Sequence, residues 1–111
     1  MREPIRVIHA PQPPPLDVSE AAFQRLVVDL ATVCGWTVIH NADSRRTQAG
    51  VPDLLLLRGR VCLWRELKTR HGRLRPAQVD VGRRLLTTGQ SWRVWRPGDW
   101  DDIVATLTQE V

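Results

Sequence analysis

Residues Val51 to Lys68 read VPDLLLLRGRVCLWRELK, and this stretch decides how the rest of the chain folds. Two apolar runs lie on either side of Gly59-Arg60, a pair that favours a tight turn. We therefore predict two antiparallel strands, at residues 51–57 and 61–68. Three charged residues, Asp53, Glu66 and Lys68, lie toward the ends of these otherwise buried strands, which calls for a chemical explanation.

The length of the turn determines which residues face each other. With glycine at the first central position, as a type II′ turn prefers, paired residue numbers sum to 119, so Asp53 lies opposite Glu66. Directly paired residues point to the same face of a sheet, and Lys68, two residues beyond Glu66, points there too. A one-residue bulge would turn Asp53 away, so this prediction requires an even loop.

Two carboxylates held side by side repel each other unless a cation neutralises them. Mg²⁺ or Mn²⁺ prefers oxygen ligands of this kind and also binds phosphate oxygens. A nearby ammonium can then orient or deprotonate an attacking water. Lys68 is the single lysine among 16 basic residues, which favours a compact donor with a tunable pKa at this position. A structural ion pair of Lys68 with either acid is the other interpretation, and the residues alone leave both open.

The segments around the hairpin predict an α/β fold. Periodicity, caps and turn residues indicate a helix at 19–34, a strand at 36–40, a helix at 77–88, a strand at 91–96 and a last helix capped by Asp99. Pro76 suits the first position of the second helix, and Gly89 ends it. The order is αβββαβ followed by a C-terminal helix.

Length and composition indicate one domain, residues 17–111, behind a proline-rich N-terminal arm at residues 1–16. No apolar run approaches the length of a membrane span, and the N-terminus lacks the apolar core of a signal peptide. We expect a cytoplasmic protein without a membrane partner. Cys34 and Cys62 fall inside apolar segments without metal-site spacing, so we expect packed free thiols.

Basic residues are concentrated in the middle of the chain. Between Ser44 and Arg96 there are 13 arginines or lysines against three acids. This surplus indicates a surface for a polyanion, most commonly a phosphate backbone, and a merely solvated face is the alternative. Arg45 and Arg46 lie in the polar loop that leads to Asp53, so they are candidate DNA-binding residues.

Two further residues could join the charged patch. Glu20 lies three residues before Phe23 and seven before Val27, on the helix stripe that faces the sheet, although an acid here also complements the helix dipole. Gln78 lies near the start of the helix after the hairpin, where an ordinary solvated residue is the alternative.

Taken together, these residues resemble the PD-(D/E)xK nuclease superfamily, and more narrowly its VRR-NUC branch. The resemblance covers about Ser19 to Arg96, and it is carried by Glu20, Gly50-Val51-Pro52-Asp53, Glu66-Leu67-Lys68 and Gln78. It implies a restriction-endonuclease-like α/β fold, with a central mixed sheet flanked by helices. Arg75 departs from the pattern, because a Ser N-cap is expected before Pro76.

The resemblance also implies a chemistry. The implied ligands of Mg²⁺ or Mn²⁺ are Glu20, Asp53, Glu66 and the carbonyl of Leu67. Asp53, Glu66 and Lys68 would be catalytic, with Lys68 positioning the water, and Gln78 would contact DNA or support the site. The implied activity is a metal-dependent, structure-selective DNA endonuclease that hydrolyses phosphodiester bonds.

Stand-alone members of similar size are typically phage or prophage proteins that work as homodimers, in the manner of Holliday-junction resolvases. The expected partners are therefore branched or junction DNA and a second copy of the chain, in the cytoplasm of a bacterial host if a phage encodes it. From another class, the chain could be a non-catalytic DNA-binding or assembly subunit that retains the nuclease fold.

Overall fold

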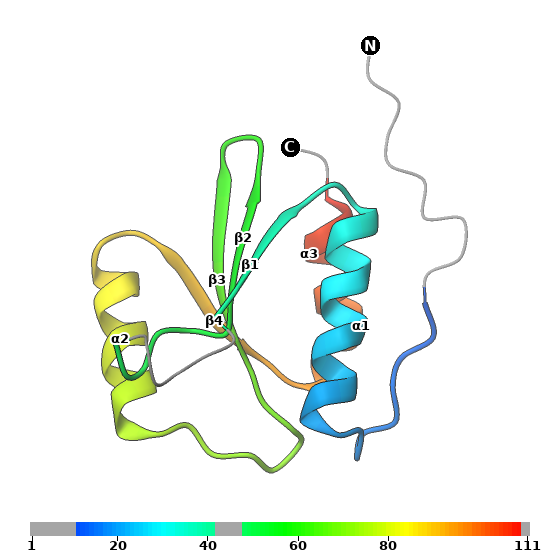
Figure 1. Ribbon diagram of the computed structural model, residues 1–111, viewed down its shortest axis with the longest axis horizontal. Helices are drawn as coiled ribbons and strands as arrows, with labels where there is room; N and C mark the ends of the chain where they lie inside the picture. Colours follow the sequence, from blue (N-terminus) through cyan, green and yellow to red (C-terminus); the bar gives the residue numbers. More distant parts are fainter. Residues whose placement is uncertain (1–10, 42–47, 110–111) are drawn as a thin grey trace.

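The computed structural model describes residues 11–41 and 48–109, and Figure 1 shows a sheet with helices on both sides. The described residues form these elements: α1 (Glu20–Val33), β1 (Thr37–His40), β2 (Leu54–Arg58), β3 (Val61–Leu67), α2 (Pro76–Thr87), β4 (Ser91–Trp95), the 3₁₀ turn η1 (Pro97–Asp99) and α3 (Trp100–Thr108). This order confirms the predicted αβββαβ core with a C-terminal helix. The prediction for β2 was wrong at its start, because the strand begins at Leu54 and not at Val51.

The strands lie in the order β1-β2-β3-β4 and form the predicted mixed sheet. β2 pairs antiparallel with both β1 and β3, whereas β3 and β4 are parallel. A parallel pair needs a crossover connection, and α2 with its flanking loops supplies it. Both strands of the quoted hairpin are therefore central in the sheet, and the ends away from the turn, at Leu54 and Leu67, are buried.

Short-range signals set most helix ends. The Ser19 hydroxyl accepts a hydrogen bond from the amide of Ala22 at 3.2 Å, which caps α1. Asp99 occupies the position before α3, but its carboxylate accepts from the amide of Arg96 at 2.8 Å. The predicted capping role of Asp99 is therefore wrong, because its side chain closes the η1 turn instead.

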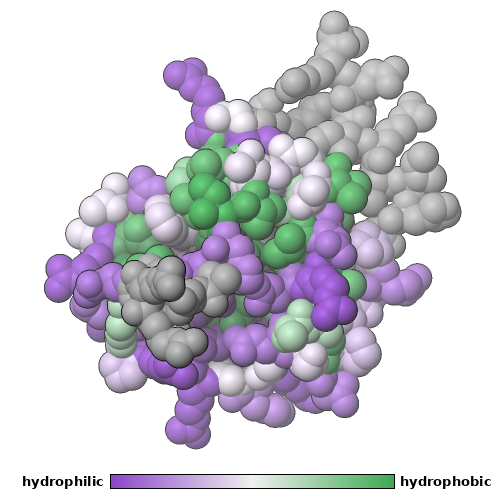
Figure 2. Space-filling view, viewed as in Figure 1, coloured by the Kyte–Doolittle hydropathy of each residue, from purple (hydrophilic) through white to green (hydrophobic). Residues whose placement is uncertain are grey.

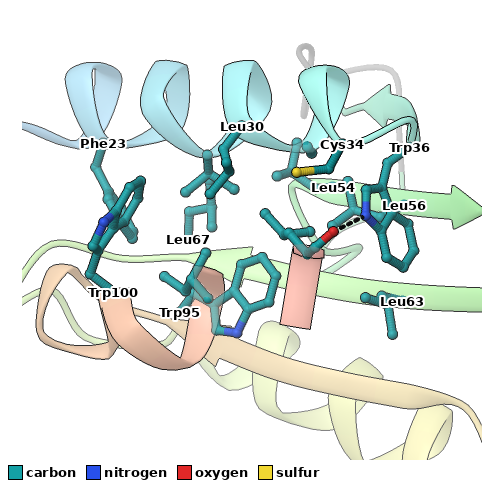
Figure 3. Packing of buried hydrophobic residues seen from close by; sticks show 14 residues of the cluster. Phe23, Leu30, Cys34, Trp36, Leu54, Leu56, Leu63, Leu67, Trp95 and Trp100 are labelled. Atoms are coloured by element: carbon teal, nitrogen blue, oxygen red, sulfur yellow. Dashed lines mark hydrogen bonds between the residues drawn. The ribbon is translucent and has the colours of Figure 1, made fainter. Parts of the chain in front are cut away.

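The main core lies between the sheet and the pair α1 and α3. Figure 3 shows its packing, in which Phe23, Leu30 and Cys34 of the α1 segment face side chains from the strands and α3. The strand residues on this face are Leu54, Leu56, Leu63, Leu67 and Trp95, all buried. They alternate along the strands, as expected when one face of a sheet is covered.

The opposite face is packed by α2, which lies mainly against β4. The approach is close at Gly82, where an added Cβ would lie 2.4 Å from the ring of Trp92. Residues of β3 that point to this side include Trp64 and Glu66. Glu66 therefore lies between the sheet and the beginning of α2, apart from the main core.

Residues 11–16 of the proline-rich arm lie against the body of the protein. The indole nitrogen of Trp100 donates a hydrogen bond to the carbonyl of Pro11 at 3.0 Å, and Pro14 is buried. Cys34 and Cys62 are free thiols, as predicted. Within the described residues, no helix is both long enough and apolar enough to cross a membrane.

Candidate active site

The hairpin has the predicted register. Leu54 pairs with Arg65 and Arg58 with Val61, so paired residue numbers sum to 119 and the turn holds two residues. Gly59 has a φ of +58°, and no described residue other than glycine has a positive φ, so Arg60 has a negative one. A type II′ turn has this combination. The even loop keeps Asp53 and Glu66 on the same side of the sheet.

The segment before β2 brings Asp53 to this position by packing on α2. Gly50 has a φ of +92°, and a Cβ at this residue would lie 2.2 Å from the carbonyl oxygen of Ala77. Only glycine allows so close an approach of the two backbones. The carbonyl of Asp53 accepts from the amide of Asn41 at 2.8 Å, which continues the pairing with the β1 side.

Asp53 and Glu66 are joined by two reciprocal contacts. The amide of Asp53 donates to Oε1 of Glu66 at 3.1 Å, and the amide of Leu67 donates to Oδ2 of Asp53 at 2.8 Å. Glu66 is only 1% exposed, and Asp53 is half-buried. Each carboxylate is therefore oriented by the backbone beside the other, so the pair is fixed in place. We call these two residues the acid pair.

The second carboxylate oxygen of Glu66 has two polar neighbours. Gln78 Nε2 donates to Oε2 at 2.5 Å, and Lys68 Nζ lies 3.9 Å from the same oxygen. Lys68 is itself largely buried, with 13% of its side chain exposed. The structure thus brings four of the predicted site residues together: Asp53, Glu66, Lys68 and Gln78.

Burial is the main reason why the pKa of Glu66 is raised to about 8, from an ordinary value of 4.5. The Asp53 carboxylate raises it further, through a hydrogen bond and through its negative charge. The ammonium of Lys68 acts in the opposite direction but is outweighed. Near neutral pH and without a metal, the acid pair therefore carries one extra proton, because two adjacent carboxylates do not both ionise easily.

This donor set fits a divalent cation of the hard type. Two neighbouring carboxylates that hold a proton between them are sites where a cation can replace that proton. Mg²⁺ is commonly bound by one or two carboxylates and several waters, so the acid pair is sufficient for it. Among residues 11–41 and 48–109, however, no group of three or more acidic, histidine or cysteine side chains gathers in one place.

The other predicted site residues have different positions. Glu20 is exposed at the first residue of α1, and it does not form a three-residue cluster with the acid pair. The backbone of Leu67 lies beside Asp53, through the amide contact described above. Arg45 and Arg46 lie outside the described residues.

Sequence reasoning overlooked Arg96. Its guanidinium Nη1 donates to the carbonyls of Thr69 and Gly72, in the loop that directly follows Lys68. Those contacts join residues that are 24 and 27 positions apart, so no local sequence pattern predicts them. The density of arginines in residues 70–75 was the signal that could have drawn attention to this loop.

A solved structure described as a "VRR_NUC domain" has the same architecture, with a TM-score of 0.64 and 23% sequence identity. The alignment covers 77% of this chain and 92% of that one. No protein-family profile and no curated protein matches the sequence. The likeness is therefore one of fold, and it agrees with the observed mixed sheet, the hairpin and the flanking helices. The chain has the fold of a VRR_NUC domain.

Proposed function

We propose that this chain is a metal-dependent, structure-selective DNA endonuclease that hydrolyses phosphodiester bonds. The observation that carries the proposal is the acid pair, held by reciprocal backbone contacts with Lys68 Nζ 3.9 Å from Glu66. The name of the solved structure with the same fold, a VRR_NUC domain, supports a nuclease. The concentration of arginines in the middle of the chain supports a nucleic-acid substrate.

Asp53 and Glu66 would hold Mg²⁺ or Mn²⁺, with the Leu67 carbonyl as the implied third oxygen. When bound, the cation neutralises phosphate charge and makes a water molecule more acidic. Glu66 accepts hydrogen bonds from Asp53 and Gln78, which fixes the orientation of its carboxylate. Lys68, largely buried beside this carboxylate, can orient the attacking water and stabilise negative charge that develops on the phosphate.

A four-way junction needs two matched cuts, whereas one acid pair cuts one strand. We therefore infer a homodimer that presents two sites to branched DNA, since a two-fold axis matches the symmetry of a junction. The same domain acting as a monomer would suit a flap or a nicked duplex. Resolution of Holliday junctions is thus the finer form of the proposal, and it requires the dimer.

The test is a cleavage assay on a panel of four-way junctions, flaps, nicked duplex and plain duplex. Each substrate is incubated with Mg²⁺, with Mn²⁺ or with EDTA. We expect cleavage of branched DNA with either metal and none with EDTA. Preference for plain duplex would contradict structure selectivity, and cleavage in EDTA would contradict the metal.

A non-catalytic DNA-binding subunit remains the second candidate. It is favoured by the exposed position of Glu20 and by the lack of a three-acid cluster among the described residues. DNA binding without cleavage, under every metal and substrate of the panel, would favour this candidate. The buried Lys68 beside Glu66 argues for the enzyme, because a binding module has no need of that arrangement.

A further inference from the structure

The loop between β3 and α2, residues 69–75, begins immediately after Lys68. Figure 1 shows it running from the end of β3 along one edge of the molecule to the start of α2. It carries three exposed arginines, Arg70, Arg73 and Arg75. None of the three forms an ion pair with a described residue. Three exposed guanidinium groups without an ion pair among the described residues, on the loop that joins Lys68 to α2, form a surface that attracts anions.

The first half of this loop is held by Arg96. Nη1 of Arg96 donates to the carbonyl of Thr69 at 2.7 Å and to the carbonyl of Gly72 at 2.6 Å. The amide of Gly72 also donates to the Thr69 carbonyl, at 3.3 Å. Hydrogen bonds from a charged donor are stronger than neutral ones, so the turn is fixed to the end of β4.

The two ends of the loop are fixed as well. At its start, the amide of Lys68 donates to the carbonyl of Trp95 at 3.1 Å. At its end, the amide of Arg75 donates to Oε1 of Gln78 at 2.8 Å, while Nε2 of the same side chain donates to Glu66. Gln78 therefore connects the last residue of the loop directly to the acid pair.

We propose that residues 69–75 bind the phosphodiester backbone of the nucleic-acid strand that enters the acid pair. Arg70, Arg73 and Arg75 make the phosphate contacts. Guanidinium groups suit this task because their planar fork matches two phosphate oxygens. This inference rests on the proposed function and adds the surface that holds the substrate.

Arg96 and Gln78 are positioning residues in this arrangement. Arg96 binds two backbone carbonyls of the loop. Gln78 binds the backbone amide of the last loop residue, Arg75, and also binds Glu66. A phosphate bound by the loop therefore lies at a fixed offset from the acid pair. Such fixed placement of reacting groups contributes to rate as well as to affinity.

The test measures binding of a labelled four-way junction in EDTA, where no cutting occurs, over a range of salt concentrations. The variant Arg70→Ala/Arg73→Ala/Arg75→Ala removes the three loop charges. The slope of log K against log salt should fall by about 2 to 3 units, since each phosphate contact contributes about 0.9. The matched control Arg25→Ala/Arg60→Ala/Arg83→Ala removes three exposed charges elsewhere that have no ion pair with a described residue, and it should leave the slope unchanged.

A second experiment separates positioning from charge. Arg96→Ala keeps all three loop arginines, so the salt slope should stay near the wild-type value. Amide exchange in residues 69–75 should become faster, and the cutting rate should fall about tenfold or more. Arg96→Lys, which can donate to one or both carbonyls, should restore part of the rate. A lower melting temperature with unchanged exchange in the loop would contradict the positioning role.

Three results would overturn the inference, in distinguishable ways. If the wild type binds DNA and the loop variant keeps its salt slope, the strand follows another path while the proposed function stands. If loop and control variants lose the same slope, only the net charge matters. If the wild type neither binds nor cuts any nucleic acid, the proposed function and the inference both fail.

Discussion

The amide of Asp53 donates a hydrogen bond to Oε1 of Glu66 at 3.1 Å, although the two residues are 13 positions apart. The backbone of Asp53 therefore orients the carboxylate of Glu66. A neutral isostere keeps one oxygen that can accept each backbone amide, although Glu66→Gln also replaces the oxygen that accepts from Gln78. The isosteres therefore remove the negative charge while the backbone contacts can be kept.

The first prediction concerns the metal. Asp53→Asn and Glu66→Gln each remove one negative ligand but keep an oxygen that accepts the backbone amide. Cleavage in Mg²⁺ or Mn²⁺ should fall at least about 100-fold, since the cation contributes several kcal/mol to the transition state. Binding of DNA in EDTA should stay close to wild type, measured by fluorescence anisotropy. A variant that cuts at a near wild-type rate would mean that the site is wrongly assigned.

The second prediction concerns Lys68. Lys68→Arg keeps the positive charge but replaces a compact donor with a larger planar group inside a largely buried space. We expect kcat to fall by about 10²-fold or more, with little change in DNA affinity. Lys68→Met serves as the neutral comparison of similar length. Equal activity of wild type and Lys68→Arg would reduce Lys68 to a general electrostatic role.

These predictions depend on a hairpin whose register could be predicted from the sequence. A two-residue turn containing glycine leaves little freedom, so the pairing of Asp53 with Glu66 followed from counting. The exact start of β2 did not follow, because the apolar pattern continues through Val51 and Pro52 while the chain there packs on α2 through Gly50.

The long-range contacts of the site could not be predicted from the sequence. The link from Gln78 to Glu66 depends on where the crossover helix places its first turn, and the hold of Arg96 on the loop depends on the bend after β4. Helical spacing placed Glu20 on the stripe of α1 that faces the sheet, and its side chain is exposed at the first residue of the helix. Its role as a metal ligand stays a prediction.

The third prediction concerns pH and uses the raised pKa of Glu66. In the metal-free protein, the folded state keeps a proton on Glu66 up to about pH 8, whereas the unfolded chain releases it near 4.5. Between these values the folded state binds more protons, so its stability must fall as pH rises. The slope contributed by this group is at most about 1.4 kcal/mol per pH unit.

Urea unfolding in EDTA at several values between pH 5 and pH 8 measures this slope. Glu66→Gln should unfold with a weaker pH dependence, because its amide does not titrate. Adding Mg²⁺ should stabilise the wild type more at pH 8 than at pH 5, since the cation competes with the proton. The same pH dependence in wild type and Glu66→Gln would contradict the raised pKa.

The fourth prediction concerns the close approach at Gly50. Gly50→Ala would place a methyl group 2.2 Å from the Ala77 carbonyl oxygen, at a φ of +92°. We expect the free energy of unfolding to fall by more than about 2 kcal/mol, from strain and overpacking together. Gly89→Ala is the matched control, because Gly89 has a φ of +84° but no atom within 4 Å of an added Cβ. It should cost only about 1 kcal/mol.

Gly50 also lies three residues before Asp53, so any shift of this segment moves an acid. Gly50→Ala should therefore lower the cutting rate at a temperature where the variant is still folded, whereas Gly89→Ala should not. Equal losses of stability in the two variants would show that the packing between this segment and α2 is less tight than described.

The last prediction concerns assembly. Trp95 and Trp100 are buried in the core, so they do not contribute to an interface. On the face of the sheet that carries the acid pair, α2 packs mainly against β4. The strands β1, β2 and β3 therefore leave apolar side chains part-buried or exposed on this face, and these are Ile39, Leu55, Leu57, Cys62 and Trp64. Figure 2 shows apolar surface where Figure 1 draws the β2–β3 hairpin.

We expect this apolar surface to form a two-fold interface with a second copy, because an isologous contact uses the same patch twice and orients two acid pairs symmetrically. Ile39→Asp, at a side chain 50% exposed, should convert a dimer at micromolar concentration into monomers, measured by light scattering. Val33→Asp, at a residue 79% exposed on α1, should leave the dimer intact. A wild type that is monomeric both free and bound to a junction would contradict the prediction, and would favour flap cutting or nicking over junction resolution.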